Sequence, residues 1–306
     1  MDHRRVKISV SPGHHVSLSP KVAIVTGAGR GIGRAIALAL AREGASVVAV
    51  SRTLSEIEET VAQVQALGGQ ALAIKADVSS QADVARMVGQ TIQAFGTVDI
   101  LVNNAGVQGP IGPLVQNSAD VWIQTVMINL VGTFLCCQAV LPVMIRQRRG
   151  KIINLSGGGA TGPRANFSAY AASKAAVVRL TETLAEEVKP YNIQVNAIAP
   201  GAAATRMQDE VVAAGDIAGE QALTEARRVL DNGGTPPDLP AALALFLASD
   251  NSDGLTGKLI AAPHDGWQSW DAQRIAELMS APWFTLRRMD PFTLRPLMDR
   301  LGGIAT

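Results

Sequence analysis

From Lys21 onward the chain alternates short apolar runs with longer segments of helical periodicity, an order that few folds accommodate. Such alternation is typical of βαβ units, whose parallel strands form a sheet covered by helices on both faces. Right-handed crossovers then predict an α/β fold with a doubly wound, mostly parallel sheet of seven strands. We expect strands at 22–26, 46–50, 71–76, 98–102, 151–155, 193–198 and 258–262, and helices at 32–42, 54–67, 80–95, 119–148, 168–188 and 238–248.

One large domain is enough to account for this chain. It has 306 residues, 47% of them hydrophobic, and a chain of this length hides about three-quarters of its unfolded surface. We expect the domain at 21–263, after a leader at 1–20 that has no clear period and is interpreted as mobile or as a misassigned start. The polar, Ala- and Gly-rich stretch 202–236 is interpreted as a lid. Residues 264–306 hold three of the four tryptophans, and we expect this tail to pack on the domain or on a neighbouring subunit.

Charge and cysteine content exclude several classes of function. The 27 basic and 26 acidic side chains leave a net charge of +1, so the chain lacks the excess charge that attracts nucleic acids or anionic membranes. Cys136 and Cys137 are adjacent and alone, which suits neither a disulfide framework nor a zinc site. No apolar run reaches the length of a membrane span, and the first residues lack a signal peptide's apolar segment. We therefore predict a cytoplasmic protein without metal, nucleic-acid or membrane partners.

The first strand runs directly into a glycine-rich turn, which an Ala- and Leu-rich helix follows. Glycines permit a tight turn and let the backbone approach a pyrophosphate, while the helix N-terminus offers free N–H groups and the positive end of its dipole. The order of strand, turn and helix predicts a Rossmann-like dinucleotide site. Its expected contacts are Thr26, Gly27, Gly29, Arg30, Gly31, Ile32 and Gly33.

The end of the second strand indicates which nicotinamide cofactor is used. Enzymes that prefer the unphosphorylated cofactor usually place an acidic residue there to bind the ribose 2′-hydroxyl, whereas this chain has Ser51 and Arg52. Arg52 and Arg30 can offer planar, charged donors to a 2′-phosphate. We therefore predict NADP(H), with NAD(H) as the alternative.

A tyrosine and a lysine four residues apart are the candidate catalytic pair. Tyr170 and Lys174 lie near the start of the helix after the fifth strand, and their spacing places both on one helix face. An unperturbed phenol has a pKa near 10, so it is a poor base at neutral pH, and a nearby ammonium group lowers that pKa. We expect Tyr170 to exchange a proton with a carbonyl or alcohol oxygen. Lys174 is expected to tune the phenol and to bind the nicotinamide ribose.

The motifs around this pair resemble those of the short-chain dehydrogenase/reductase family, in particular its 3-oxoacyl-[acyl-carrier-protein] reductase-like members, from about Lys21 to Ile260. Taken alone, each motif can be explained by a turn or an exposed helix face, but the order of the motifs along the chain matches the family. They are the glycine spacing at 27, 31 and 33, Asn103-Asn104-Ala105-Gly106, Asn154-Leu155-Ser156, Tyr170 with Lys174, and Gln194-Val195-Asn196-Ala197-Ile198-Ala199-Pro200-Gly201.

The resemblance implies roles for further residues and an assembly. In the family, an Asp after the third strand contacts the adenine, and an Asn in the long helix carries a proton-relay water. The resemblance also implies a homodimer or homotetramer formed through the helices at 119–148 and 168–188. The positions assigned on this basis are Asp77 and Val78 at the adenine, Asn104, Ala105 and Gly106 after the fourth strand, Asn129 at the relay, and Pro200, Gly201 and Thr205 at the nicotinamide.

One position departs from the family pattern. The substrate-orienting serine usually stands 13 residues before the tyrosine, where this chain has Gly157, with Ser156 one position earlier. Neighbouring strand residues point to opposite faces, so Ser156 can replace that serine only if the following glycines bend the chain. Ser156 is kept as a candidate, and a glycine N–H or an ordered water is the other option.

Together these residues predict an NADP(H)-dependent oxidoreductase that transfers hydride between nicotinamide and a small carbonyl or secondary-alcohol substrate. The alternative is an NADP(H)-binding protein with weak or no catalysis, acting as a sensor or as an inactive partner. Gly157 alone supports it, and it predicts that Gly157→Ser gains activity.

Overall fold

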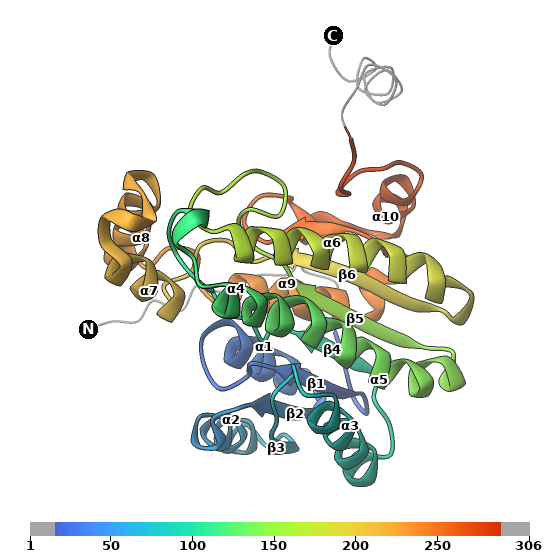
Figure 1. Ribbon diagram of the computed structural model, residues 1–306. Coiled ribbons are helices and arrows are strands. Elements are labelled where there is room, and N and C mark those ends of the chain that lie inside the picture. The colour runs from blue at the N-terminus through green and yellow to red at the C-terminus, as the bar shows by residue number, and fades with distance from the viewer. Residues whose placement is uncertain (1–15, 289–306) are drawn as a thin grey trace.

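The computed structural model describes residues 16–288, and this part of the chain contains one seven-stranded sheet (Figure 1). The strand order is β3-β2-β1-β4-β5-β6-β7, and every neighbouring pair is parallel. The order reverses between β1 and β4, so the predicted doubly wound fold is confirmed. The strands are β1 (Val22–Thr26), β2 (Ser46–Ser51), β3 (Ala71–Lys75), β4 (Ile100–Asn103), β5 (Gly150–Leu155), β6 (Ile193–Ala199) and β7 (Leu259–Ala261).

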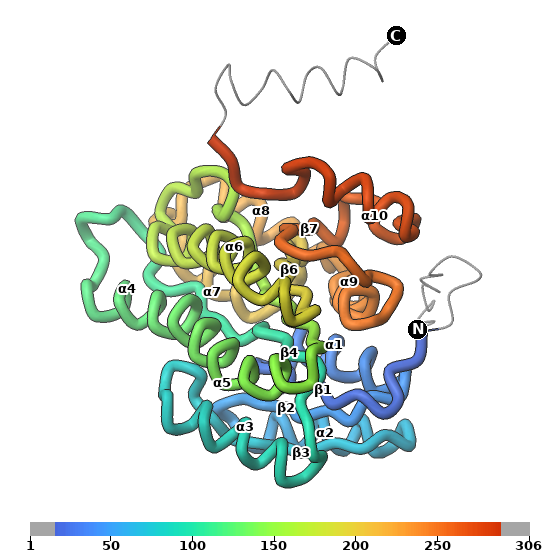
Figure 2. The backbone as a smooth tube through the Cα atoms, turned by 90° about the vertical axis from the view of Figure 1, so that its right-hand side faces the viewer, coloured from blue at the N-terminus to red at the C-terminus, as the bar shows by residue number. Residues whose placement is uncertain are grey.

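Helices cover both faces of the sheet (Figure 2). They bury two separate apolar cores. The first core lies under α1, α2 and α9, and the second lies under α3, α5 and α6. Residues of β1, β4 and β5 are buried throughout, as expected for strands covered on both faces. The helices are α1 (Gly31–Arg42), α2 (Leu54–Ala66), α3 (Gln81–Phe95), α4 (Ala119–Val126), α5 (Gly132–Gln147), α6 (Ser168–Val188), α7 (Arg206–Ala214), α8 (Glu220–Asn232), α9 (Asp238–Ala248) and α10 (Ala272–Met279).

A π-helical turn at Met127–Val131 joins α4 to α5, so residues 119–147 form one continuous helical stretch. By length and apolar composition, this stretch would pass as a membrane span, which corrects the prediction that the chain has no run of that kind. Its inner side packs in the second core, which accounts for part of its apolar character, while Val121, Ile123, Met127 and Phe134 are exposed. Cys136 and Cys137 lie on that side, where burial raises the pKa of the Cys137 thiol to about 12.

Residues on both sides of the predicted domain at 21–263 pack on it, as expected for the tail but not for the leader. Of the predicted leader, residues 16–20 are described, and Leu18 is fully buried with its N–H bonded to the Glu43 carbonyl at 2.7 Å. One leucine in a polar segment does not by itself predict burial, so the predicted domain began at Lys21. After β7, Trp267 is also fully buried and packs on Phe246, with 5.9 Å between the ring centroids. Residues 1–15 and 289–306 of the predicted leader and tail lie outside the described range.

The segment interpreted as a lid contains two helices, α7 and α8, which stand beside the amino-terminal end of α6 (Figure 1). A bridge between Ala203 and Gly234 closes its base. Its apolar side chains form a small third core with Phe167 and Tyr170. The segment therefore shares an apolar cluster with the predicted catalytic tyrosine.

Candidate active site

The glycine turn at the end of β1 has the backbone that its residues predict. Gly27 and Gly31 have φ angles of +64° and +53°, a region that favours glycine. A Cβ atom on Gly33 would run into the carbonyl of Gly27, so only glycine permits this approach of α1 to the turn. Because α1 begins at Gly31, its unpaired N–H groups lie at the turn. The turn can therefore hold a pyrophosphate.

Side chains from both strands hold the glycine turn in place. Asn104 donates from Nδ2 to the carbonyl oxygens of Thr26 and Gly27, at 3.0 and 3.1 Å. In return, the Thr26 hydroxyl oxygen accepts the N–H groups of Asn104 and Ala105, at 3.0 and 3.1 Å. These bonds join β1 to β4 at the point where the strand order reverses, which is where open α/β sheets bind ligands. Thr26 and Asn104 therefore stabilise the backbone of the glycine turn.

The segment 202–236 reaches the same turn through Thr205, whose Cγ2 lies 3.5 Å from where a Cβ atom on Gly31 would be. Gly201, at φ +83°, turns the chain from β6 toward the lid, and a Cβ atom there would collide with Thr235. Pro200 and Gly201 therefore follow the carboxyl end of β6, while Thr205, within the segment 202–236, lies beside the glycine turn.

The end of β2 gathers both arginines and two carboxylates. Arg30 pairs with Glu56 at 3.1 Å, and Arg52 lies 4.0 Å from the Asp77 carboxylate. Burial pushes the pKa of Asp77 upward, but hydrogen bonds from Ser79 and the charge of Arg52 outweigh it and lower that pKa. Sequence reasoning missed Glu56, whose Oε2 would lie 2.9 Å from a Cβ atom on Gly29. Its position in the first turn of α2 was the available signal.

Farther toward the substrate side, Lys174 and Asn129 converge on Gly106, and Tyr170 lies beside Lys174. A Cβ atom on Gly106 would lie 3.1 Å from Asn129 Oδ1 and 3.4 Å from Lys174 Nζ. The ammonium group of Lys174 donates to the Leu155 carbonyl at 2.8 Å and lies 5.7 Å from the Tyr170 ring centroid. The sequence-predicted group is therefore assembled in one place.

Asn129 is held from several directions within the π-helical turn. Its Oδ1 accepts the Val107 N–H at 2.9 Å, while its Nδ2 donates to the Val107 carbonyl and to the Ser173 hydroxyl, both at 3.0 Å. Such π-turns inside longer helices are frequent at functional sites. The turn fixes the Asn129 side chain between α6 and the loop after β4.

The electrostatics of the pair differ from the prediction. Burial raises the pKa of the Tyr170 phenol, and the charge that opposes this rise belongs to Arg164. Burial also lowers the pKa of Lys174 to about 8. The sequence predicted that Lys174 would lower the pKa of Tyr170, but the desolvation of a buried phenol is the larger effect. In this state the phenol is protonated at neutral pH and can act as an acid.

Gly157 rather than Ser156 faces the phenol. A Cβ atom on Gly157 would lie 2.4 Å from Tyr170 Oη, whereas the Ser156 hydroxyl donates to the Lys174 carbonyl at 3.4 Å. Side chains alternate along β5 and its extension, so Ser156 points to the α6 backbone. We therefore withdraw the assignment of Ser156 as the replacement for the missing serine. No described residue forms a hydrogen bond with the phenol oxygen.

Arg164 is a further functional candidate that sequence reasoning missed. It lies in the loop between β5 and α6, with its guanidinium carbon 3.8 Å from the Phe167 ring centroid and 5.8 Å from that of Tyr170. The only signal was an arginine within a glycine-rich segment before the tyrosine. Among residues 16–288, no group of three or more His, Cys, Asp or Glu side chains could hold a metal ion.

Known proteins share this architecture. Residues 21–215 match the family described as short chain dehydrogenase. The 3-oxoacyl-[acyl-carrier-protein] reductase FabG of Staphylococcus aureus (strain Mu50 / ATCC 700699) is 40% identical over 242 residues, which cover 78% of this chain and 95% of that protein.

Two similar solved structures contain different nicotinamide cofactors. The NAD+-bound xylitol dehydrogenase has a TM-score of 0.73 and 33% identity, and the match covers 79% of this chain and 96% of that one. A variant of the actinorhodin polyketide ketoreductase with NADPH has a TM-score of 0.74 and 29% identity, and the match covers 80% of this chain and 97% of that one.

Proposed function

Because the chain belongs to the short-chain dehydrogenase family, and is thus an oxidoreductase that acts on carbonyl and alcohol groups, we propose that it is an NADP(H)-dependent reductase of small carbonyl compounds. The observation that carries this proposal is the Tyr170 phenol. It is protonated and free of hydrogen bonds to described residues, and it lies beside Lys174 and Gly157. A carbonyl oxygen can therefore approach it and take its proton.

The residues present fit a dinucleotide. Gly27, Gly31 and Gly33 leave the turn open to a pyrophosphate, and the N-terminus of α1 faces it. When bound, the cofactor supplies the hydride. Lys174 then holds the nicotinamide ribose with N–H donors that it does not spend on Leu155. Asn129 supports proton return to the phenol from the solvent side.

The preference for NADP(H) rests on the end of β2. Arg30 and Arg52 have half-exposed side chains whose guanidinium groups can turn from Glu56 and Asp77 to a 2′-phosphate. Exposed ion pairs of this kind contribute about 0–1 kcal/mol, so a doubly charged phosphate can displace them. NAD(H) is the competing choice, because Glu56 can accept a hydrogen bond from a 2′-hydroxyl.

We also propose a cytoplasmic homodimer or homotetramer. Large apolar side chains on α4, the π-turn and α5 are exposed in the single chain, namely Val121, Ile123, Met127 and Phe134. Such a cluster is expected at an interface between copies. The alternative of a cofactor-binding protein without catalysis is not favoured by the relatives, which are reductases and dehydrogenases by name.

Purified protein tests the function directly. NADPH oxidation is followed with 3-oxoacyl thioesters, keto-sugars and cyclic ketones, for wild type and for Tyr170→Phe, after NADPH binding has been shown to be equal in both. We expect wild type to turn over at least one class and Tyr170→Phe to lose about 100-fold or more, since general-acid groups contribute about that much. Equal turnover by both proteins would remove Tyr170 from its proposed role.

A further inference from the structure

Arg164 is a half-buried arginine whose charge is not satisfied within the described chain. Its guanidinium group forms no ion pair and donates no hydrogen bond to any residue at 16–288, and it stacks on the Phe167 ring. A guanidinium carries five N–H donors in a fixed fork. Burial lowers the pKa of Arg164, which shows that its surroundings do not fully compensate the charge. An arginine in this condition is prepared to bind an anion from outside the chain.

The loop around Arg164 keeps the guanidinium group close to the catalytic phenol. Its carbon lies 5.8 Å from the Tyr170 ring centroid. Gly158 leaves room beside it, because a Cβ atom there would have Arg164 Nη1 as its nearest neighbour at 3.9 Å. Gly159, at φ +91°, lies against the Arg164 side chain. Gly157 stands at the position of the usual serine, and the two glycines after it leave space for the Arg164 side chain.

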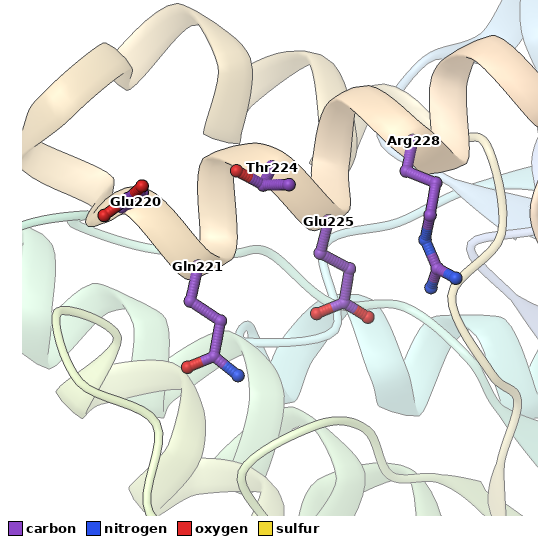
Figure 3. A pocket seen from close by; sticks show the side chains of 5 residues that line it. All are labelled: Glu220, Gln221, Thr224, Glu225 and Arg228. Atoms are coloured by element: carbon purple, nitrogen blue, oxygen red, sulfur yellow. The ribbon is translucent and has the colours of Figure 1, made fainter.

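Among the described residues, Glu225 on α8 is the carboxylate whose charge influences the pKa of Arg164. Glu225 raises the pKa of Arg164 through its charge without forming an ion pair with it. Figure 3 shows Gln221, Glu225 and Arg228 projecting from one side of α8, where they line a hollow. The negative charge of Glu225 repels any anion at Arg164, and it repels a singly charged ligand less than a doubly charged phosphate.

We propose that Arg164 binds the carboxylate of the substrate, so that the carbonyl compound reduced at Tyr170 is an oxo acid. This inference rests on the proposed reductase function and adds the substrate class. Arginine and carboxylate form two parallel, charge-assisted hydrogen bonds. The contact with the Phe167 ring, 3.8 Å from the guanidinium carbon, restricts the positions that this group can take. The carboxylate held there places the neighbouring carbonyl group at the phenol.

The test compares each acid with its neutral ester. Pyruvate, acetoacetate and levulinate are assayed against their methyl esters with NADPH, using wild type, Arg164→Gln and Arg164→Lys. Arg227→Gln is the control, since it removes the same charge from an exposed position on α8. Arg164→Gln is expected to lower kcat/KM for the preferred acid by roughly 10- to 100-fold, the usual worth of hydrogen bonds to a charged group. The ester is expected to change by less than about threefold, and Arg164→Lys to recover part of the loss.

Two outcomes overturn the inference. Equal losses on acid and ester place Arg164 at the reacting oxygen instead, and no loss on either removes it from substrate binding.

A binding measurement separates this inference from the proposed function. Each acid and each ester is titrated into the complex of the protein with NADP⁺, and the shift in melting temperature is recorded. A shift by the acid that is absent in Arg164→Gln supports the carboxylate site even when no turnover is seen. Equal shifts by acid and ester in both proteins overturn it.

Discussion

Adding one methyl group at Gly157 should disable the enzyme. The Cβ atom of Gly157→Ala would lie 2.4 Å from Tyr170 Oη, and ordinary contact begins near 3.4 Å, so the phenol oxygen must move by about 1 Å. The Tyr170 ring is buried and packed against the lid, which leaves no easy path for this movement. A misplacement of about 1 Å in a reacting group can cost about 100-fold in rate. The same overpacking is expected to reduce the free energy of unfolding by about 1–3 kcal/mol.

The assay is kcat/KM for NADPH-dependent ketone reduction, alongside urea unfolding. Gly158→Ala is the matched control from the same glycine run, because its Cβ atom meets nothing closer than 3.9 Å. Neither glycine has a positive φ, so backbone strain does not enter the comparison. If Gly157→Ala kept wild-type kcat/KM, or if Gly157→Ser raised it, the steric reasoning would be refuted. The second result would revive the interpretation of this chain as an inactive cofactor-binding protein.

Three further predictions concern charge. With the pKa of Lys174 at about 8 and that of Tyr170 raised, kcat/KM for reduction should be level at neutral pH and fall as the pH rises through about 8, where the ammonium group is lost. A pH profile that stays level to about 9 would contradict this. Arg52→Ala should lower kcat/KM with NADPH by roughly 10- to 100-fold and leave NADH nearly unchanged, and an equal loss with both cofactors would exclude a 2′-phosphate contact. Glu182→Gln should lower the free energy of unfolding by about 1–3 kcal/mol, because this buried carboxylate accepts the Leu286 N–H at 2.6 Å and pairs with two arginines that tie the tail to α6. Glu187→Gln, exposed on the same helix, is the control in urea unfolding.

The parts of the fold that sequence predicted well are those with local physical causes. Each strand is an apolar run bounded by polar turns, and the glycine turn follows β1 because only glycine fits positive φ and the close approach of α1. Tyr170 and Lys174 were found because a spacing of four is itself the geometry of a helix face. The assignment of Asn129 came only from the family resemblance, and its position beside Gly106 was not predicted, since the two residues lie far apart in the chain.

What sequence reasoning missed depends on tertiary neighbours. The helix α8 carries Leu223, Ala226 and Val229 at helical spacing, but its polar composition concealed that pattern. In sequence, Arg164 is typical of a surface charge, and only the structure places Phe167 beneath it. The direction of the Ser156 hydroxyl was set by the strand alternation of β5, which the glycines after it left ambiguous.

The segment 202–236 and the proposed proton donor share one small core, in which Val211, Ala218 and Ala226 pack with Phe167 and Tyr170. If α7 and α8 moved away from α6, water would replace these apolar groups around the two aromatic rings. Hydration eases ionisation of a phenol, so the phenol holds its proton most firmly while this core is intact. The position of α7 and α8 would therefore act on the acidity of the group that is proposed to donate the proton.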